Sequence, residues 1–183
     1  MSEEMIVRNC SPTLAGLKTA NLFSCSFDSE REMTASLRRW NEALSGKGIC
    51  MIPLRKSAKR ALVYVYRPGR LARDLLDPRA QEILRSNGYS CKNTNSCLKE
   101  LIQRLKTQEE FPHEIGLFLG YPTEDVRLFI ENEARNYKFV GCWKVYGDEA
   151  EAQKTFAKFK KCTDVYSRLQ AKGTSVVRLT VAT

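Results

Sequence analysis

The sequence lacks the short motifs that most often identify nucleotide-binding proteins and hydrolases. Neither Gly-x-Gly-x-x-Gly nor Gly-x-Ser-x-Gly occurs in the 183 residues, so the usual evidence for dinucleotide binding and for a hydrolase nucleophile is missing. Residues 16–19 resemble part of a phosphate-binding loop, but the full pattern Gly-x-x-x-x-Gly-Lys-Ser/Thr is absent. These absences argue against a nucleotide hydrolase.

Long apolar runs and biased tracts are also missing. No apolar run approaches the roughly 20 residues that a transmembrane helix needs, which excludes a membrane span. Glycine and proline number only ten and six, and 43% of the residues are hydrophobic, which argues against a disordered or fibrous chain. We expect a single globular domain over residues 1–183, with an internal sub-boundary near 107–112.

Closely spaced metal ligands do not occur. The nearest pair among the seven cysteines, Cys91 and Cys97, is six residues apart, so we expect no metal site. The cysteine count is odd, and residues 1–5 show no basic region followed by an apolar run. We therefore expect reduced thiols and a cytoplasmic protein. The sequence indicates no particular cofactor, and the oligomeric state is unknown.

Histidine is almost absent, since His113 is the only one. Any imidazole catalysis must use it, although a structural role is the favoured interpretation. The neighbouring Glu114 is expected on the opposite face of a strand, so the two would not serve one reacting atom. If the protein is an enzyme, His113 is the acid–base candidate. Cys10, in a loop expected to be exposed and followed by Lys18, is the nucleophile candidate.

What the sequence does contain is a concentrated basic segment. The formal net charge is +9, and residues 54–73 hold no Asp or Glu. Within it we expect two strands, 49–54 and 61–67, joined by a polar turn at 56–59. The basic residues of this segment are Arg55, Lys56, Lys59, Arg60, Arg67, Arg70 and Arg73. They form either an ordinary solvated surface or a docking site for nucleic acid or an acidic protein.

The other elements of the first two-thirds are mainly helical. Ser29 followed by Glu32 matches a capping box. Apolar residues then follow at helical spacing: Met33, Leu37, Trp40 and Leu44. Further helices are expected from Pro68, with an interruption at Pro78, and over the stripe that starts at Cys97.

The last third predicts alternating strands and helices. We expect strands at 114–121, 138–146 and 175–181, separated by a helix at 122–134 and by a longer helix that Asp148 caps. This order is typical of right-handed parallel crossovers. The predicted fold class is therefore α/β, a mixed β-sheet with helices packed on it and a βαβαβ C-terminal third with parallel crossovers.

A ligand site is expected where these strands end. If the strands ending at Tyr121 and Tyr146 are parallel neighbours, both tyrosines and Thr123 meet at one crevice. Lys144 shares a strand face with Tyr146 and could reach an anion, or its stem could lie along the sheet with the ammonium in water. Lys18 is the remaining candidate ligand residue. The leading hypothesis is a binding protein or enzyme for a small anionic ligand.

Three sequence runs carry a family resemblance: residues 10–18 (CSPTLAGLK), 111–122 (FPHEIGLFLGYP) and 141–146 (GCWKVY). With these runs the chain resembles an uncharacterised bacterial family known as domain of unknown function 3793, over nearly the whole length. The resemblance implies no activity. Members of that family often carry cysteine where this chain has Phe139 and Ser167, so the resemblance gives no support to a thiol mechanism at those positions.

Overall fold

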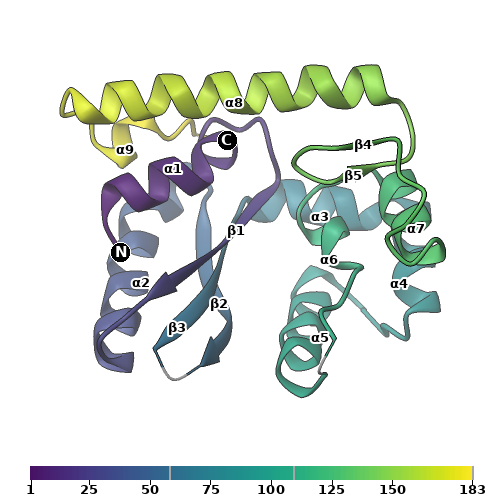
Figure 1. Cartoon of the computed structure of the whole chain (residues 1–183). Helices are drawn as coiled ribbons and strands as arrows, with labels where there is room; N and C mark the ends of the chain where they lie inside the picture. The colour runs from purple at the N-terminus through teal and green to yellow at the C-terminus, as the bar shows by residue number, and fades with distance from the viewer. Residues whose placement is uncertain (58, 109, 183) are drawn as a thin grey trace. The chain divides into compact units, whose positions relative to one another are not determined.

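The computed structural model describes residues 1–57, 59–108 and 110–182 (Figure 1). The chain divides into two compact units, unit 1 (Met1–Gly69 and Phe159–Thr183) and unit 2 (Arg70–Lys158). The sub-boundary expected near 107–112 falls inside unit 2. A single domain over the whole chain stays a prediction. Position 58 of the expected turn and position 109 of the expected connection lie outside the described residues.

Unit 1 is built on a three-stranded antiparallel sheet. Its strands are β1 (Ala20–Ser26), β2 (Cys50–Ser57) and β3 (Arg60–Tyr66), in the order β1-β3-β2. The predicted hairpin of β2 and β3 is thus confirmed, with a register irregularity between Pro53 and Arg55. Such a bulge bends the hairpin near its turn.

Helices cover one face of this sheet. They are α1 (Glu3–Leu14) and α2 (Glu30–Leu44), and the short helix α9 (Val176–Leu179) contacts α1 (Figure 1). The prediction of α2 is confirmed, because the Ser29 side chain accepts a hydrogen bond from the Glu32 N–H and the predicted apolar stripe is buried. A 3-10 turn, η1 (Ser45–Lys47), follows α2.

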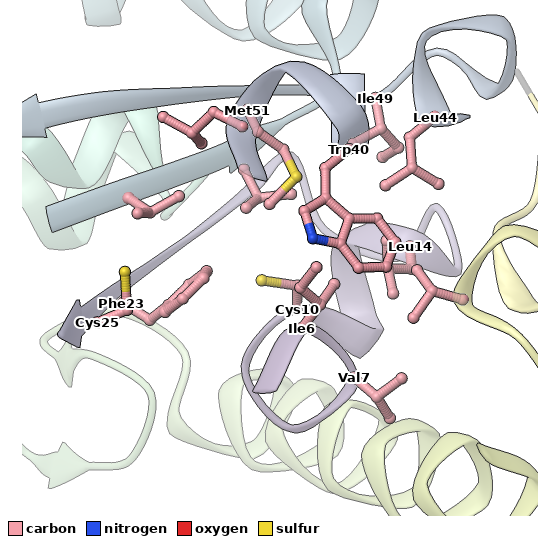
Figure 2. Packing of buried hydrophobic residues seen from close by; sticks show 14 of the residues in the cluster. Ile6, Val7, Cys10, Leu14, Phe23, Cys25, Trp40, Leu44, Ile49 and Met51 are labelled. Atoms are coloured by element: carbon pink, nitrogen blue, oxygen red, sulfur yellow. The ribbon is translucent and has the colours of Figure 1, made fainter. Parts of the chain in front are cut away.

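The core of unit 1 lies between these helices and the sheet. Alternate residues of β3, such as Val63 and Val65, pack there with α1 and α2. Figure 2 shows Cys10 surrounded by apolar side chains, including Ile6 and Trp40. Cys10 belongs to α1 and is fully buried. The expectation that Cys10 sits in an exposed loop is therefore wrong.

Unit 2 is mostly helical. It contains α3 (Pro68–Leu76, which starts just before the unit boundary), α4 (Pro78–Ser86), α5 (Thr94–Thr107), α6 (Ile115–Phe118) and α7 (Thr123–Glu131). A small antiparallel hairpin of β4 (Phe139–Val140) and β5 (Lys144–Val145) follows, and then α8 (Glu149–Ala171) begins. The predicted helix start at Pro68 and the predicted interruption at Pro78 are confirmed, since α3 ends at Leu76 and α4 begins at Pro78, where proline fits the first position of a helix.

The predicted parallel crossovers of the last third are wrong, since all strand pairs within the described residues are antiparallel. Residues 114–121 contain α6 and end in a tight turn, where Gly120 takes a φ of 71° that a strand could not continue. Residues 138–146 fold back as the β4–β5 hairpin. Residues 175–181 contain α9, whose start Ser175 caps.

The oxidation state of two cysteines also differs from the expected one. Cys91 and Cys97 form a disulfide, with their Cα atoms 4.8 Å apart, so the expectation that all thiols are reduced is wrong for this pair. No helix in the described residues is long and apolar enough to cross a membrane.

Candidate functional site

A cleft of about 290 Å³ lies within unit 2, beside α6, α7 and the β4–β5 hairpin. We call it the aromatic cleft because aromatic rings form much of its wall. The aromatic lining residues are Phe111, Tyr121, Phe129 and Trp143. Small and aliphatic residues complete the wall: Ile115, Gly116, Val126, Val140 and Gly141. His113, Asp125 and Lys144 are its polar lining residues.

Tyr121 and Trp143 join two separate segments of the wall. Their ring centroids are 4.9 Å apart, and the Tyr121 hydroxyl donates a hydrogen bond to the Cys142 carbonyl oxygen at 3.1 Å. Burial, together with a smaller effect of the Cys142 thiol, raises the pKa of Tyr121 to about 12. Tyr121 therefore stays a neutral part of the wall at physiological pH.

Asp125 fixes the hairpin against α7. Its carboxylate is buried and accepts hydrogen bonds from the backbone N–H groups of Tyr146 and Gly147, both at 2.8 Å. It also accepts one from the Trp143 indole N–H at 2.7 Å. Charged hydrogen bonds of this kind are among the stronger ones in proteins. Asp125 thus sets the position of the Trp143 ring.

Gly116 and Gly141 are required by close packing around the cleft. A Cβ atom at Gly116 would approach a methyl group of Val126 to 2.7 Å, and one at Gly141 would overlap the Phe156 ring. Glycine at these positions lets α6 meet α7 and lets the hairpin meet α8.

Lys144 places a cation at this cleft. Its ammonium donates a hydrogen bond to the Ala134 carbonyl oxygen at 2.8 Å and lies 4.7 Å from the Tyr137 ring centroid and 5.7 Å from that of Phe129. Ala134 has a left-handed backbone with a φ of 63°, an uncommon conformation for a residue with a side chain. The ammonium is therefore partly enclosed by aromatic rings, which stabilise a cation.

His113 lies near the Phe129 ring. It is exposed, lines the cleft, and meets the Phe129 ring edge-on at 5.1 Å. It sits in a turn before α6, so its expected place at the start of a strand is wrong. The neighbouring Glu114 is buried and accepts a hydrogen bond from the Tyr89 hydroxyl at 2.9 Å. Glu114 therefore does not act together with His113.

The other predicted site residues lie in different surroundings. Thr123 is the first residue of α7 and is half-buried. The hydroxyl of Tyr146 is buried and has no hydrogen-bond partner among the described residues. Lys18 is buried in unit 1, whereas the aromatic cleft is in unit 2. Of the five predicted ligand residues, the structure thus places Tyr121 and Lys144 in the wall of one cleft.

Cys10 has surroundings that disfavour a nucleophile. Burial raises the pKa of its thiol, and the opposing effect of Lys18 is smaller. A reactive cysteine needs an accessible thiolate. Within the described residues, no group of three or more His, Cys, Asp or Glu side chains is arranged to hold a metal ion.

The basic residues separate into three groups. The first four, Arg55, Lys56, Lys59 and Arg60, are exposed at the end of the β2–β3 hairpin. Arg67 is only 1% exposed and donates hydrogen bonds within unit 1, so it does not contribute to a surface. Arg70 and Arg73 belong to α3 in unit 2.

Three residues of the cleft were not predicted from the sequence: Phe111, Phe129 and Asp125. Their spacing follows no single period because they come from a loop and a short helix. The available signal was composition, since aromatic residues recur from Phe111 to Trp143. Acidic residues are common in the first turn of a helix, where they interact favourably with the helix dipole. The sequence therefore does not indicate that Asp125 holds the hairpin.

Comparison with known proteins identifies a family. The model of a family described as "Protein of unknown function (DUF3793)" matches residues 6–180. No curated protein and no solved structure is significantly similar to the chain.

Proposed function

Since the chain belongs to the DUF3793 family, whose description names no activity, we propose from the aromatic cleft that the protein binds a small organic anion with an apolar, planar body. The observation that carries this proposal is the meeting of four aromatic rings with the Lys144 ammonium in one cleft of about 290 Å³. Pockets of this kind, apolar with a few convergent polar groups, are the usual form of small-molecule sites.

The charges of the cleft favour an anion over a cation. Lys144 makes one hydrogen bond among the described residues, and an ammonium has three donors. Two donors therefore remain for a carboxylate, sulfonate or phosphate. The carboxylate of Asp125, the acidic lining residue, is already bonded to three N–H donors of the hairpin. Both of its oxygens are thus already engaged in hydrogen bonds within unit 2.

The rim of the cleft supports an apolar ligand body. Phe111 and Val140 line the cleft and are 42% and 51% exposed. When a ligand covers large apolar side chains that are exposed around a cleft, the burial of their surface favours binding. Phe129 contacts both His113 and Lys144. A planar ligand against Phe129 would therefore lie near both polar side chains.

Replacing Lys144 with methionine is expected to weaken binding of an anionic aromatic probe by about tenfold or more, because a charge-assisted hydrogen bond contributes roughly 1.5–3 kcal/mol. The measurement is a fluorescence titration with anilinonaphthalene sulfonate, and with phenylnaphthylamine as the same ring system without the anion. Affinity for the neutral probe should change little.

Lys138→Met is the matched control. Lys138 lies beside the same hairpin and also donates one hydrogen bond to a backbone carbonyl, that of Gly147 at 2.9 Å, but it does not line the cleft. Equal losses of affinity in both lysine variants, or equal losses for both probes, would contradict the proposal.

A second candidate function is binding of a polyanion, nucleic acid or an acidic protein, at the β2–β3 hairpin end. It is favoured by the exposure of Arg55, Lys56, Lys59 and Arg60, which make no ion pair with any part of the chain that the structure describes. An unpaired cluster of this kind attracts phosphates or carboxylates through its field.

Charge reversal at Arg55, Lys59 and Arg60 is expected to abolish binding of a DNA oligonucleotide, measured by fluorescence anisotropy. Wild-type affinity should fall steeply as salt rises, because each phosphate contact releases counterions. Reversal at Lys160 and Lys161, which are exposed on α8, serves as control. Polyglutamate in place of DNA distinguishes an acidic protein partner. A flat salt dependence would count against this candidate.

A further inference from the structure

The Cys91–Cys97 disulfide lines a second cavity of unit 2, with a volume of about 450 Å³. We call it the disulfide cavity. We propose that this disulfide is a thiol–disulfide exchange site, and that the disulfide cavity holds a low-molecular-weight thiol with carboxylate groups beside Cys91. This site is separate from the aromatic cleft, with which it shares no lining residue.

The loop around the disulfide is held in place by hydrogen bonds of its own. The Ser90 N–H and hydroxyl both donate to the Glu100 carboxylate. The Asn93 side chain accepts from the Ser96 N–H at 2.9 Å, and the Ser96 hydroxyl accepts from the Asn93 N–H at 3.0 Å. This capping box starts α5 without help from the disulfide. The same backbone therefore suits both the disulfide and the dithiol, as a reversible exchange requires.

The two sulfur atoms differ in access. Cys91 is half-buried in the loop, whereas Cys97 is 4% exposed. An incoming thiolate can reach the sulfur of Cys91 more readily. Cys97 is the fourth residue of α5, and the positive end of a helix stabilises a thiolate that leaves there. The structure thus assigns Cys91 as the attacked sulfur and Cys97 as the leaving group.

The charges of the cavity indicate the kind of thiol. Arg85 and Lys92 are the charged side chains among its described lining residues. Leu75 and Leu84 give it an apolar floor. Two cations and no lining carboxylate favour a thiol that carries carboxylate groups, such as a glutathione-like peptide, over a neutral thiol.

The exchange balances in two steps. In the first, the thiolate of the small thiol attacks Sγ of Cys91, a mixed disulfide forms, and the Cys91–Cys97 bond breaks with its electron pair on Sγ of Cys97, which takes a proton from water. In the second, another thiolate attacks the small thiol's sulfur in the mixed disulfide and releases Cys91 as a thiolate. Two small thiols are oxidised to their disulfide, and one protein disulfide is reduced to two thiols.

The test uses the full chain and oxidised glutathione as probe. The variant Cys97→Ser should form a mixed disulfide at Cys91, and Cys91→Ser should leave the buried Cys97 unmodified. Peptide mapping by mass spectrometry locates each adduct, with the exposed Cys142 as an internal reference. Equal modification of Cys91 and Cys97, or modification of Cys97 alone, would overturn the assignment.

A second measurement follows reduction of the wild-type disulfide by reduced glutathione and by neutral mercaptoethanol. Lys92→Gln should slow the glutathione reaction several-fold and leave the mercaptoethanol reaction unchanged, whereas Lys99→Gln, exposed on α5 outside the cavity, should slow neither. Circular dichroism should stay the same on reduction. A disulfide that glutathione reduces only after the chain unfolds is structural, and that result would overturn the proposal.

Discussion

Replacing Arg67 with methionine is expected to lower the free energy of unfolding of unit 1 by roughly 3–5 kcal/mol, because a buried network of charged hydrogen bonds is lost. The guanidinium is 1% exposed. It donates to the carbonyl oxygens of Thr13 and Leu14 at 2.7 Å, of Val181 at 2.8 Å and of Lys47 at 3.3 Å. Without it, the carbonyl oxygens of Thr13 and Leu14 each lose one donor at the buried end of α1.

The position of Arg67 explains the size of this effect. Thr13 and Leu14 are the last residues of α1, and the final carbonyl groups of a helix have no partner within it. A cation at this end also complements the helix dipole. Val181 belongs to the C-terminal segment of unit 1, and its N–H donates a hydrogen bond to the Leu14 carbonyl oxygen at 3.0 Å. One side chain, directly after β3, therefore joins α1 and the C-terminal segment of unit 1.

The measurement is denaturant unfolding followed by Trp40, which lies in the core of unit 1, in a Trp143→Phe background. Arg60→Met is the matched control, since Arg60 is exposed at the other end of β3, and it should change stability by less than about 0.5 kcal/mol. Arg67→Lys, which keeps the charge but not the planar donor array, should lie between the two. Equal stability of Arg67→Met and Arg60→Met would show that the guanidinium does not hold unit 1 together.

Replacing Asp125 with alanine is expected to have the second large effect, a lower free energy of unfolding of unit 2. The change removes the acceptor for the N–H groups of Tyr146 and Gly147 and for the Trp143 indole. We expect a loss of about 3 kcal/mol or more, because buried donors without an acceptor cost roughly 1–3 kcal/mol each. Amide hydrogen exchange at Tyr146 and Gly147 should accelerate strongly, and the affinity of the aromatic cleft for its probe should fall with it.

A conservative variant separates the hydrogen bonds that Asp125 accepts from the backbone from the one that it accepts from Trp143. In Asp125→Asn, the amide oxygen can still accept from the backbone N–H groups, but the amide NH₂ faces the indole N–H of Trp143, donor against donor. The cost of Asp125→Asn should therefore shrink in a Trp143→Phe background. Glu124→Ala, a neighbouring acid whose ion pair with Arg127 is on the surface, should cost less than about 1 kcal/mol. Additive costs of Asp125→Asn and Trp143→Phe would contradict this account.

The elements that the sequence predicted well carry local signals. Ser29 and Glu32 mark the start of α2, and an apolar stripe at helical spacing marks its buried face. Pro68 marks a further helix start, and Pro78 marks the interruption between α3 and α4. These signals are formed by neighbours in the chain, so they do not depend on the rest of the fold.

The elements that were predicted wrongly carry ambiguous signals. Residues 115–119 form a short apolar run, and such a run suits a buried strand as well as a buried turn of helix. The β-branched residues Val176 and Val177 favour a strand by propensity, yet Ser175 caps α9 there. In the helix α1, Pro12 and the polar residues Ser11 and Thr13 are buried beside the apolar ones, so the sequence of this segment does not show a purely apolar buried face.

The candidate site was predictable only in part. Tyr121 and Lys144 were selected for reasons that assumed parallel strands, and they meet in the aromatic cleft although that assumption is wrong. The role of Arg67 could not be predicted, because its partners Thr13 and Val181 lie 54 and 114 residues away in the sequence. Contacts over such separations depend on the whole fold.

The most direct test of the central claim is a native mass spectrum of the protein purified without oxygen, compared with its mass after denaturation. We expect the wild-type protein to retain a small organic acid that denaturation releases, and Lys144→Met to retain much less of it than Lys138→Met. A retained molecule that all three proteins hold equally, or one that is a cation, would contradict an anion site at Lys144. A bare protein that also shows no Lys144-dependent binding of anilinonaphthalene sulfonate would contradict the proposed function itself.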